Sequence, residues 1–135
     1  MAANGTHMNV RDAVEADAGR LASLASAPRD VMRNLVHDRT VRVAEVDDEI
    51  QGFVSYDARE GTVHVTQLEG DETVYDDLLA EPIRFARSEG MAVELLAPED
   101  EEDIQEAATA AAFEEIGPGP RFDGQSTTRY RMSDP

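Results

Sequence analysis

The sequence contains no cysteine and no lysine. The absence of cysteine excludes disulfides, thiolate nucleophiles and cysteine metal sites together. No apolar run is long enough to span a membrane, and no signal peptide is visible. We therefore expect a cytoplasmic protein that has no membrane partner.

All 12 basic residues are arginine, and 29 acidic residues give the chain a formal net charge of −17. This composition resembles that of proteins from salt-in halophiles, in which molar salt screens carboxylate repulsion over a Debye length of roughly 3 Å. The alternatives are an acidic binding surface and a disordered chain, but the 41% of hydrophobic residues fall on faces, which argues against disorder. No basic stripe exists to bind a phosphate backbone, so we expect no nucleic-acid partner.

The length of 135 residues is enough for one domain with a core and too short for two. We expect this domain to span residues 9–132. The flanking residues are expected to be a leader, 1–8, and a tail, 133–135.

The stretch from Thr62 to Leu96 predicts a strand, a helix and a second strand in immediate succession. Residues 62–68 are rich in β-branched side chains and half alternating, which favours a strand. Residues 74–86 repeat apolar side chains with the 3.6-residue period of an amphipathic helix, which Gly90 ends. Residues 91–96 are a short apolar run typical of a strand buried on both faces. The stretch therefore predicts a βαβ unit with a right-handed crossover.

The flanking segments predict further strands and helices around this unit. Alternation and turn residues predict an antiparallel hairpin over residues 40–56. Residues 14–25 predict one helix, and Asp30 is expected to be the N-cap of a second. The acids before residues 104–113 match the dipole of an alanine-rich helix, which we favour over a metal site.

Strands are also expected at residues 9–13 and 127–132, and a loop at residues 117–120. The predicted order is β-α-α-β-β-β-α-β-α-β-β. The predicted fold class is α/β (mixed α+β), a central twisted mixed sheet with helices on both faces.

This order of elements resembles that of the GCN5-related N-acetyltransferase (GNAT) superfamily, over nearly the whole stretch from Asn9 to Met132. Ile50-Gln51-Gly52-Phe53 is similar to the family's I-x-G strand, and residues 112–115 are similar to the Gly-Phe-Glu exit from its last helix. The resemblance implies that residues 62–68 and 92–96 are parallel neighbours that diverge at their carboxyl ends. In the family this cleft takes the pantetheine arm of acetyl-CoA.

The family binds the pyrophosphate of acetyl-CoA with an Arg/Gln-x-x-Gly-x-Gly/Ala loop at a helix N-terminus. Counting back from Leu78-Leu79 places the corresponding stretch at residues 68–75. The residues expected to bind the cofactor are therefore Leu68, Gly70, Asp71, Glu72, Thr73, Val74 and Tyr75. This stretch keeps one glycine, and its two acids repel a pyrophosphate unless salt screens them or they point away.

Glu69 is the candidate catalytic base, because it ends the strand that lines the family's cleft. His64 on the same strand is a second candidate. The family places a tyrosine acid in its last helix, and Ala108 stands at the corresponding position here.

The resemblance implies an N-acetyltransferase in which an amine attacks the thioester of acetyl-CoA directly. The acceptor is then a small-molecule or peptide amine, and a homodimer is left open. The alternative is a degenerate domain of the same fold that binds a small ligand or a protein without catalysis, because fold alone does not decide function.

Overall fold

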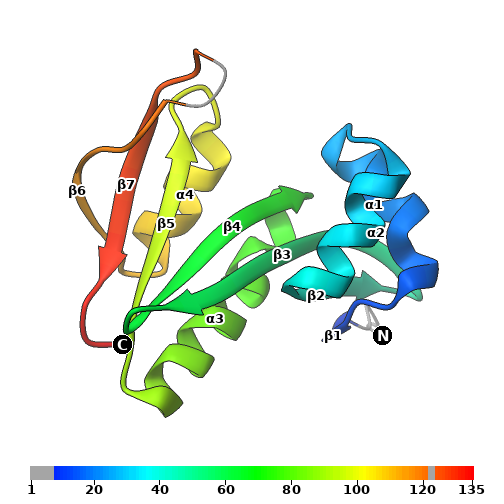
Figure 1. Ribbon diagram of the computed structural model, residues 1–135, viewed down its shortest axis with the longest axis horizontal. Helices are drawn as coiled ribbons and strands as arrows, with labels where there is room; N and C mark the ends of the chain where they lie inside the picture. The colour runs from blue at the N-terminus through cyan, green and yellow to red at the C-terminus, as the bar shows by residue number, and fades with distance from the viewer. Residues whose placement is uncertain (1–7, 122–123) are drawn as a thin grey trace, which may run out of the picture.

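The computed structural model describes residues 8–121 and 124–135 (Figure 1). Residues 1–7 of the expected leader lie outside the described residues. Met8 is the first residue of strand β1 and pairs with Val46, so this strand begins one residue before its predicted start. No helix in the described part of the chain is long and apolar enough to cross a bilayer.

The elements follow the predicted order, with two short 3₁₀ helices added before α1 and α3. They are β1 (Met8–Asp12), a 3₁₀ helix (Glu15–Asp17), α1 (Ala18–Ala25), α2 (Arg29–Asp38), β2 (Thr40–Val46), β3 (Glu49–Arg59), β4 (Thr62–Gly70), a 3₁₀ helix (Glu72–Val74), α3 (Tyr75–Glu89), β5 (Ala92–Pro98), α4 (Glu102–Ala110), β6 (Glu114–Pro118) and β7 (Thr127–Met132).

All seven strands join one mixed sheet in the order β1-β2-β3-β4-β5-β7-β6. The β4–β5 pair is parallel and the other neighbouring pairs are antiparallel. The parallel pair flanks α3, which confirms the predicted βαβ unit and the predicted fold class.

Strands β4 and β5 separate half-way along their length. Their register runs from Thr62–Ala92 to Val65–Leu95 and then stops, although β4 continues to Gly70. Figure 1 shows β4 turning away from β5 toward the tip of its arrow. This confirms the expected divergence, and it leaves the β5-facing backbone groups of residues 66–70 without a ladder partner in the described sheet.

Helices cover the two faces of the sheet over different strands (Figure 1). Helices α1 and α2 enclose a core with Leu21, Met32 and Phe53, all at most 1% exposed. On the opposite face α3 and α4 enclose a larger core that includes Leu78 and Val93. Full burial of one such side chain contributes about 1.5–3 kcal/mol, so both layers hold the sheet in place.

Two details of the prediction were wrong. Asp30 lies inside the first turn of α2, because Pro28 is the N-cap and its fixed φ leads into the helix. Gly117 and Pro118 end strand β6 and pair with Arg129 and Thr128 on β7. A proline is tolerated there because β6 is at the edge of the sheet, where no neighbour needs its N–H.

Candidate functional site

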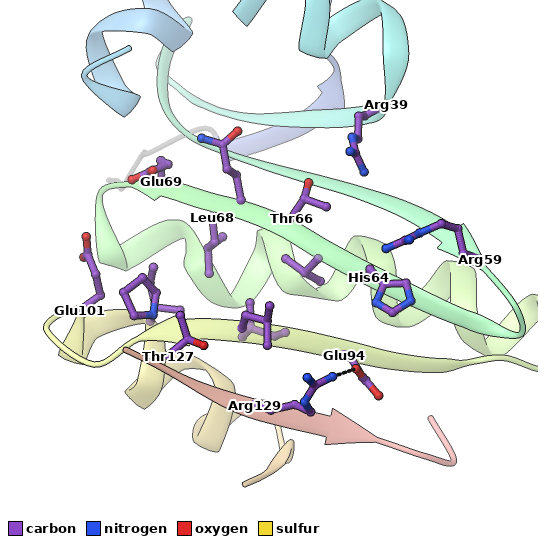
Figure 2. A pocket seen from close by; sticks show the side chains of 16 residues that line it. Arg39, Arg59, His64, Thr66, Leu68, Glu69, Glu94, Glu101, Thr127 and Arg129 are labelled. Carbon is purple, nitrogen blue, oxygen red and sulfur yellow. Dashed lines mark hydrogen bonds and ion pairs between the residues drawn. The ribbon is translucent and has the colours of Figure 1, made fainter. Parts of the chain in front are cut away.

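A cavity of about 550 Å³ lies where β4 and β5 diverge. Residues 64–69 of β4 form one wall, and residues 94–96 with Pro98 of β5 form the other. Thr127 and Arg129 of β7 and Ile104 of α4 complete the β5 side (Figure 2). The cavity is therefore a direct consequence of the ladder's end at Val65 and Leu95.

A β-bulge in β4 marks the start of the divergence. Tyr56 on β3 pairs with Val65, but the preceding Ser55 pairs with Gln67, so Thr66 has no register partner on β3. The hydroxyls of Thr66 and Ser55 lie 2.6 Å apart and hold this turn of the strand. A bulge bends its strand, which accounts for the turn of β4 away from β5.

Charged side chains cross the sheet in one row at the closed end of the cavity. Asp57 on β3, His64 on β4 and Glu94 on β5 are successive register partners, and Arg131 on β7 is the partner of Glu94. Directly opposed residues project from the same face of a sheet. The row lies one residue before Val65, the last paired residue of β4.

Arginines hold both carboxylates of this row. Arg39 Nη1 lies 2.6 Å from Asp57 Oδ2, and Arg59 Nε lies 3.7 Å from the same oxygen. Glu94 is 13% exposed and takes Arg129 at 3.0 Å on one oxygen and Arg131 on the other. Each carboxylate is thus shared by two guanidinium groups.

Glu69 lies at the opposite, open end of the cavity, near Glu101 (Figure 2). Burial raises the pKa of the Glu69 carboxyl above its ordinary value, and the negative charge of Glu101 adds to the rise. A carboxylate with a raised pKa is a better proton acceptor near neutral pH. The side chain is therefore able to act as a base, although it is about five residues, or roughly 16 Å, along β4 from His64.

Two glycines bring the end of β4 against β3. A Cβ on Gly70 would lie 2.3 Å from the carbonyl oxygen of Gln51, and φ there is +119°. A Cβ on Gly52 would lie 2.8 Å from Val74 Cγ2 and 2.9 Å from the carbonyl oxygen of Glu69. The glycine of the β4–α3 connection is thus required by packing against β3.

The segment that leads into α3 contains a carboxylate, Asp71, that is bound by the backbone of the same segment. The Asp71 carboxylate accepts hydrogen bonds from the Thr73 N–H at 2.9 Å and from the Thr73 hydroxyl at 2.8 Å. These bonds lower the pKa of Asp71.

Two further groups near α3 have a raised pKa. Exposed Glu72 lies against Asp103 of α4, which raises the pKa of the Glu72 carboxyl. Burial, with Glu69 as the next cause, raises the pKa of Tyr75 to about 12.

No family model matches the chain, and no curated protein matches it in sequence. Solved structures match it over nearly its full length. A protein from Desulfovibrio desulfuricans assigned to the GNAT acetyltransferases is 18% identical, with a TM-score of 0.76 over 96% of this chain and 100% of that one. An N-acetyltransferase from Staphylococcus aureus is 10% identical, with a TM-score of 0.78 over 94% and 97%.

RimL, a ribosomal alpha-N-protein acetyltransferase in complex with coenzyme A, is 15% identical, with a TM-score of 0.73 over 94% of each chain. The chain has the GNAT fold. At sequence identities of 10–18%, these matches establish the fold and do not transfer the substrates of the matched proteins to this chain.

The GNAT fold of this chain brings together only part of the predicted site. Leu68 and Glu69 line the cavity. Val74 and Tyr75 are buried in the core under α3, and Tyr75 donates to the carbonyl oxygen of Gly70 at 3.1 Å. Asp71 and its neighbours Glu72 and Thr73 are exposed at the start of the helix and are not part of the cavity lining.

Sequence reasoning missed the charged residues Arg39, Glu94 and Arg129. Each stands in a segment that sequence analysis identifies only as a helix end or a strand, and no motif joins them. Their only signal is positional: Glu94 is an acid inside an apolar run, Arg39 directly follows a helix, and Arg129 lies on the last strand. Among the described residues, no group of three His, Asp or Glu side chains is placed to hold a metal ion.

Proposed function

We propose that this protein is an N-acetyltransferase that transfers an acetyl group from acetyl-CoA to an amine. The observation that supports it most is the end of the β4–β5 ladder at Val65 and Leu95, with a cavity of about 550 Å³ beyond it. Unpaired strand backbone provides N–H and C=O groups for an amide-containing arm such as pantetheine. The matched structures with this fold include one solved with coenzyme A.

The donor supplies a thioester carbonyl as the electrophile. The acceptor nitrogen would attack its carbon, form the C–N bond and break the C–S bond. The proton from nitrogen passes to a base, and the departing thiolate takes a proton. Ala108, in the position of the family's tyrosine acid, is fully buried and cannot give that proton, so water is assigned this role.

His64 and Glu69 are the two candidate bases, at opposite ends of the cavity. Glu69 lies at the open end of the cavity, where the arm would enter, and His64 lies at the closed end, where the thioester would be held. Position therefore favours His64, and the raised pKa favours Glu69. We propose that one of these two residues is the base, and substitution of each in turn distinguishes them.

The pantetheine arm and the diphosphate of acetyl-CoA would bind in different environments. The arm fits the cavity between the strands. The diphosphate meets Asp71, whose carboxylate already accepts the Thr73 N–H, with Glu72 and Asp103 close by. We infer that these charges weaken donor binding and that high salt, which screens them, restores it. We also propose that the net charge of −17 is an adaptation to high salt.

The second candidate is a domain of the same fold that binds a ligand or protein without catalysis. It is favoured by the Asp71–Thr73 contact and by Ala108 at the acid position. Calorimetric titration with acetyl-CoA and CoA, in dilute buffer and in molar KCl, decides between the two. Saturable binding supports the acetyltransferase, and no binding at any salt concentration replaces it with the second candidate.

A further inference from the structure

We propose that the acceptor amine also carries a carboxylate close to its nitrogen, as a free amino acid does, and that Arg39, Arg59 and Arg129 bind this carboxylate. The proposal rests on the proposed acetyl transfer. It starts from the charge around the closed end of the cavity, where these three arginines belong to the lining (Figure 2). We call them the arginine patch.

The arginine patch keeps a positive charge although it contacts carboxylates. Asp57 is shared by Arg39 and Arg59. Glu94 is shared by Arg129 and Arg131. One negative charge against two guanidinium groups leaves each set net positive. In a chain with a net charge of −17, such a cavity end selects an anionic group.

Most donors of the arginine patch remain available to a ligand. Among the described residues, Arg39 and Arg129 each direct one N–H to a side-chain acceptor, and Arg59 has none within hydrogen-bond distance. A guanidinium group has five N–H donors, arranged as a fork that matches the two oxygens of a carboxylate. Figure 2 shows Arg39 and Arg59 extending toward His64 from one side and Arg129 lying on the other.

The position of the patch fixes the kind of anion. His64 and Glu94 stand one residue before the last rung of the ladder, and one strand residue spans about 3.3 Å. In the proposed reaction the thioester would lie in the cavity that begins beyond that rung, where the strands separate. A carboxylate in the patch is therefore only a few bonds from the attacking nitrogen. A free amino acid has this geometry, whereas the N-terminal residue of a peptide has a neutral amide instead.

The test compares acceptors that differ only in the carboxylate. Each of the 19 proteinogenic amino acids other than cysteine, and its carboxamide, is incubated with acetyl-CoA and protein, and the released CoA thiol is measured with a thiol reagent; cysteine is left out because its own thiol would react. The chain has no cysteine, so the protein adds no background. Salt is set to the lowest KCl concentration at which far-UV circular dichroism shows the native fold.

We expect at least one amino acid to exceed its amide by about tenfold or more in kcat/KM, since a bidentate charged pair is lost in the amide. Arg59→Gln should remove most of this preference through KM. It removes a 66% exposed side chain, so the fold is retained. Arg84→Gln is the matched control, because Arg84 is 67% exposed on α3 and outside the cavity lining.

If amides or peptides react as fast as amino acids, the proposal that the arginine patch binds a carboxylate is wrong, while the proposed acetyl transfer is still supported. If nothing reacts, thermal shift with the N-acetyl amino acids and their amides decides the site without catalysis. The proposal is supported if an N-acetyl amino acid raises the unfolding temperature of the natural protein, its amide does not, and Arg59→Gln abolishes the difference. No difference between acid and amide overturns it.

Discussion

The carboxylate of Asp71 accepts both the backbone N–H and the hydroxyl of Thr73, at 2.9 and 2.8 Å. In a helix N-terminus that binds phosphate, such N–H groups face the ligand. Here a side chain of the same segment takes one of them. The 3₁₀ helix that leads into α3 is therefore capped by a side chain of its own segment, and a diphosphate bound there would have to compete with Asp71.

Neutralising the acids at this position should strengthen donor binding. We expect Asp71→Asn combined with Glu72→Gln to tighten acetyl-CoA binding about tenfold in dilute buffer and hardly at all in molar KCl, where the charges are screened. Asparagine keeps an oxygen that can accept the Thr73 N–H. S-acetylpantetheine, which has no phosphate, is the control ligand and should bind both proteins equally in calorimetry. A gain with the control ligand would assign the effect to the arm instead.

Substitution of the two candidate bases should separate them. If position decides, His64→Gln lowers kcat/KM for the best acceptor by about 10² or more, while Glu69→Gln has a smaller effect. Single-turnover rates at saturating acetyl-CoA isolate the chemical step from donor binding. The reverse ranking would return the base role to Glu69.

The contact between β3 and the β4–α3 segment should be sensitive to one methyl group. In Gly52→Ala the new Cβ meets Val74 and the Glu69 carbonyl below 3 Å, so we expect a loss of about 1–3 kcal/mol in unfolding free energy. The displaced segment should also raise KM for acetyl-CoA. Gly19→Ala in α1 is the control, because its Cβ has nothing nearer than 3.9 Å, and a helical alanine adds about 0.5–1 kcal/mol. Urea unfolding measures both.

Glu69 should lower stability at neutral pH. Its folded-state pKa is raised, so the folded protein binds the proton more tightly than the unfolded chain, and stability falls as the pH rises through that pKa. Glu69→Gln should therefore have a higher Tm than the natural protein at pH 7. The difference should shrink as the pH is lowered toward 4.5. Asp71→Asn should behave oppositely: its lowered pKa stabilises the natural protein above that pKa, and this advantage is lost in acid.

The acid excess predicts a salt-dependent fold. The 29 acidic residues include pairs in close contact, such as Glu72 and Asp103 at the starts of neighbouring helices. Dialysis from molar KCl to dilute buffer should lower the unfolding temperature, because repulsion is no longer screened. An unfolding temperature that does not change with KCl would favour an acidic binding surface over halophilic adaptation.

The sequence alone predicted the order of elements, because each depends on local patterns. Apolar and polar residues alternate over residues 40–46, and apolar residues repeat with the helical period over residues 74–86. The parallel pairing of β4 and β5 also followed, since a helix between two strands requires a crossover. The predicted order includes a strand before the last one, but its end was misplaced, because the sequence does not show that Gly117 and Pro118 lie on an edge strand, where a proline is tolerated.

Tertiary structure alone decided the chemistry of the cavity. The charged residues that line the cavity come from four separate segments and meet only in the folded sheet: Arg39 follows α2, Arg59 ends β3, Glu94 is on β5 and Arg129 is on β7. A shift of one residue in any strand would turn its side chain to the other face. The bulge at Thr66 lies at the point where the strands part, and Gly52 permits the far end of β4 to lie close against β3. The sequence thus determined that two strands lie side by side, and packing across the sheet determined where they separate and which charges surround that point.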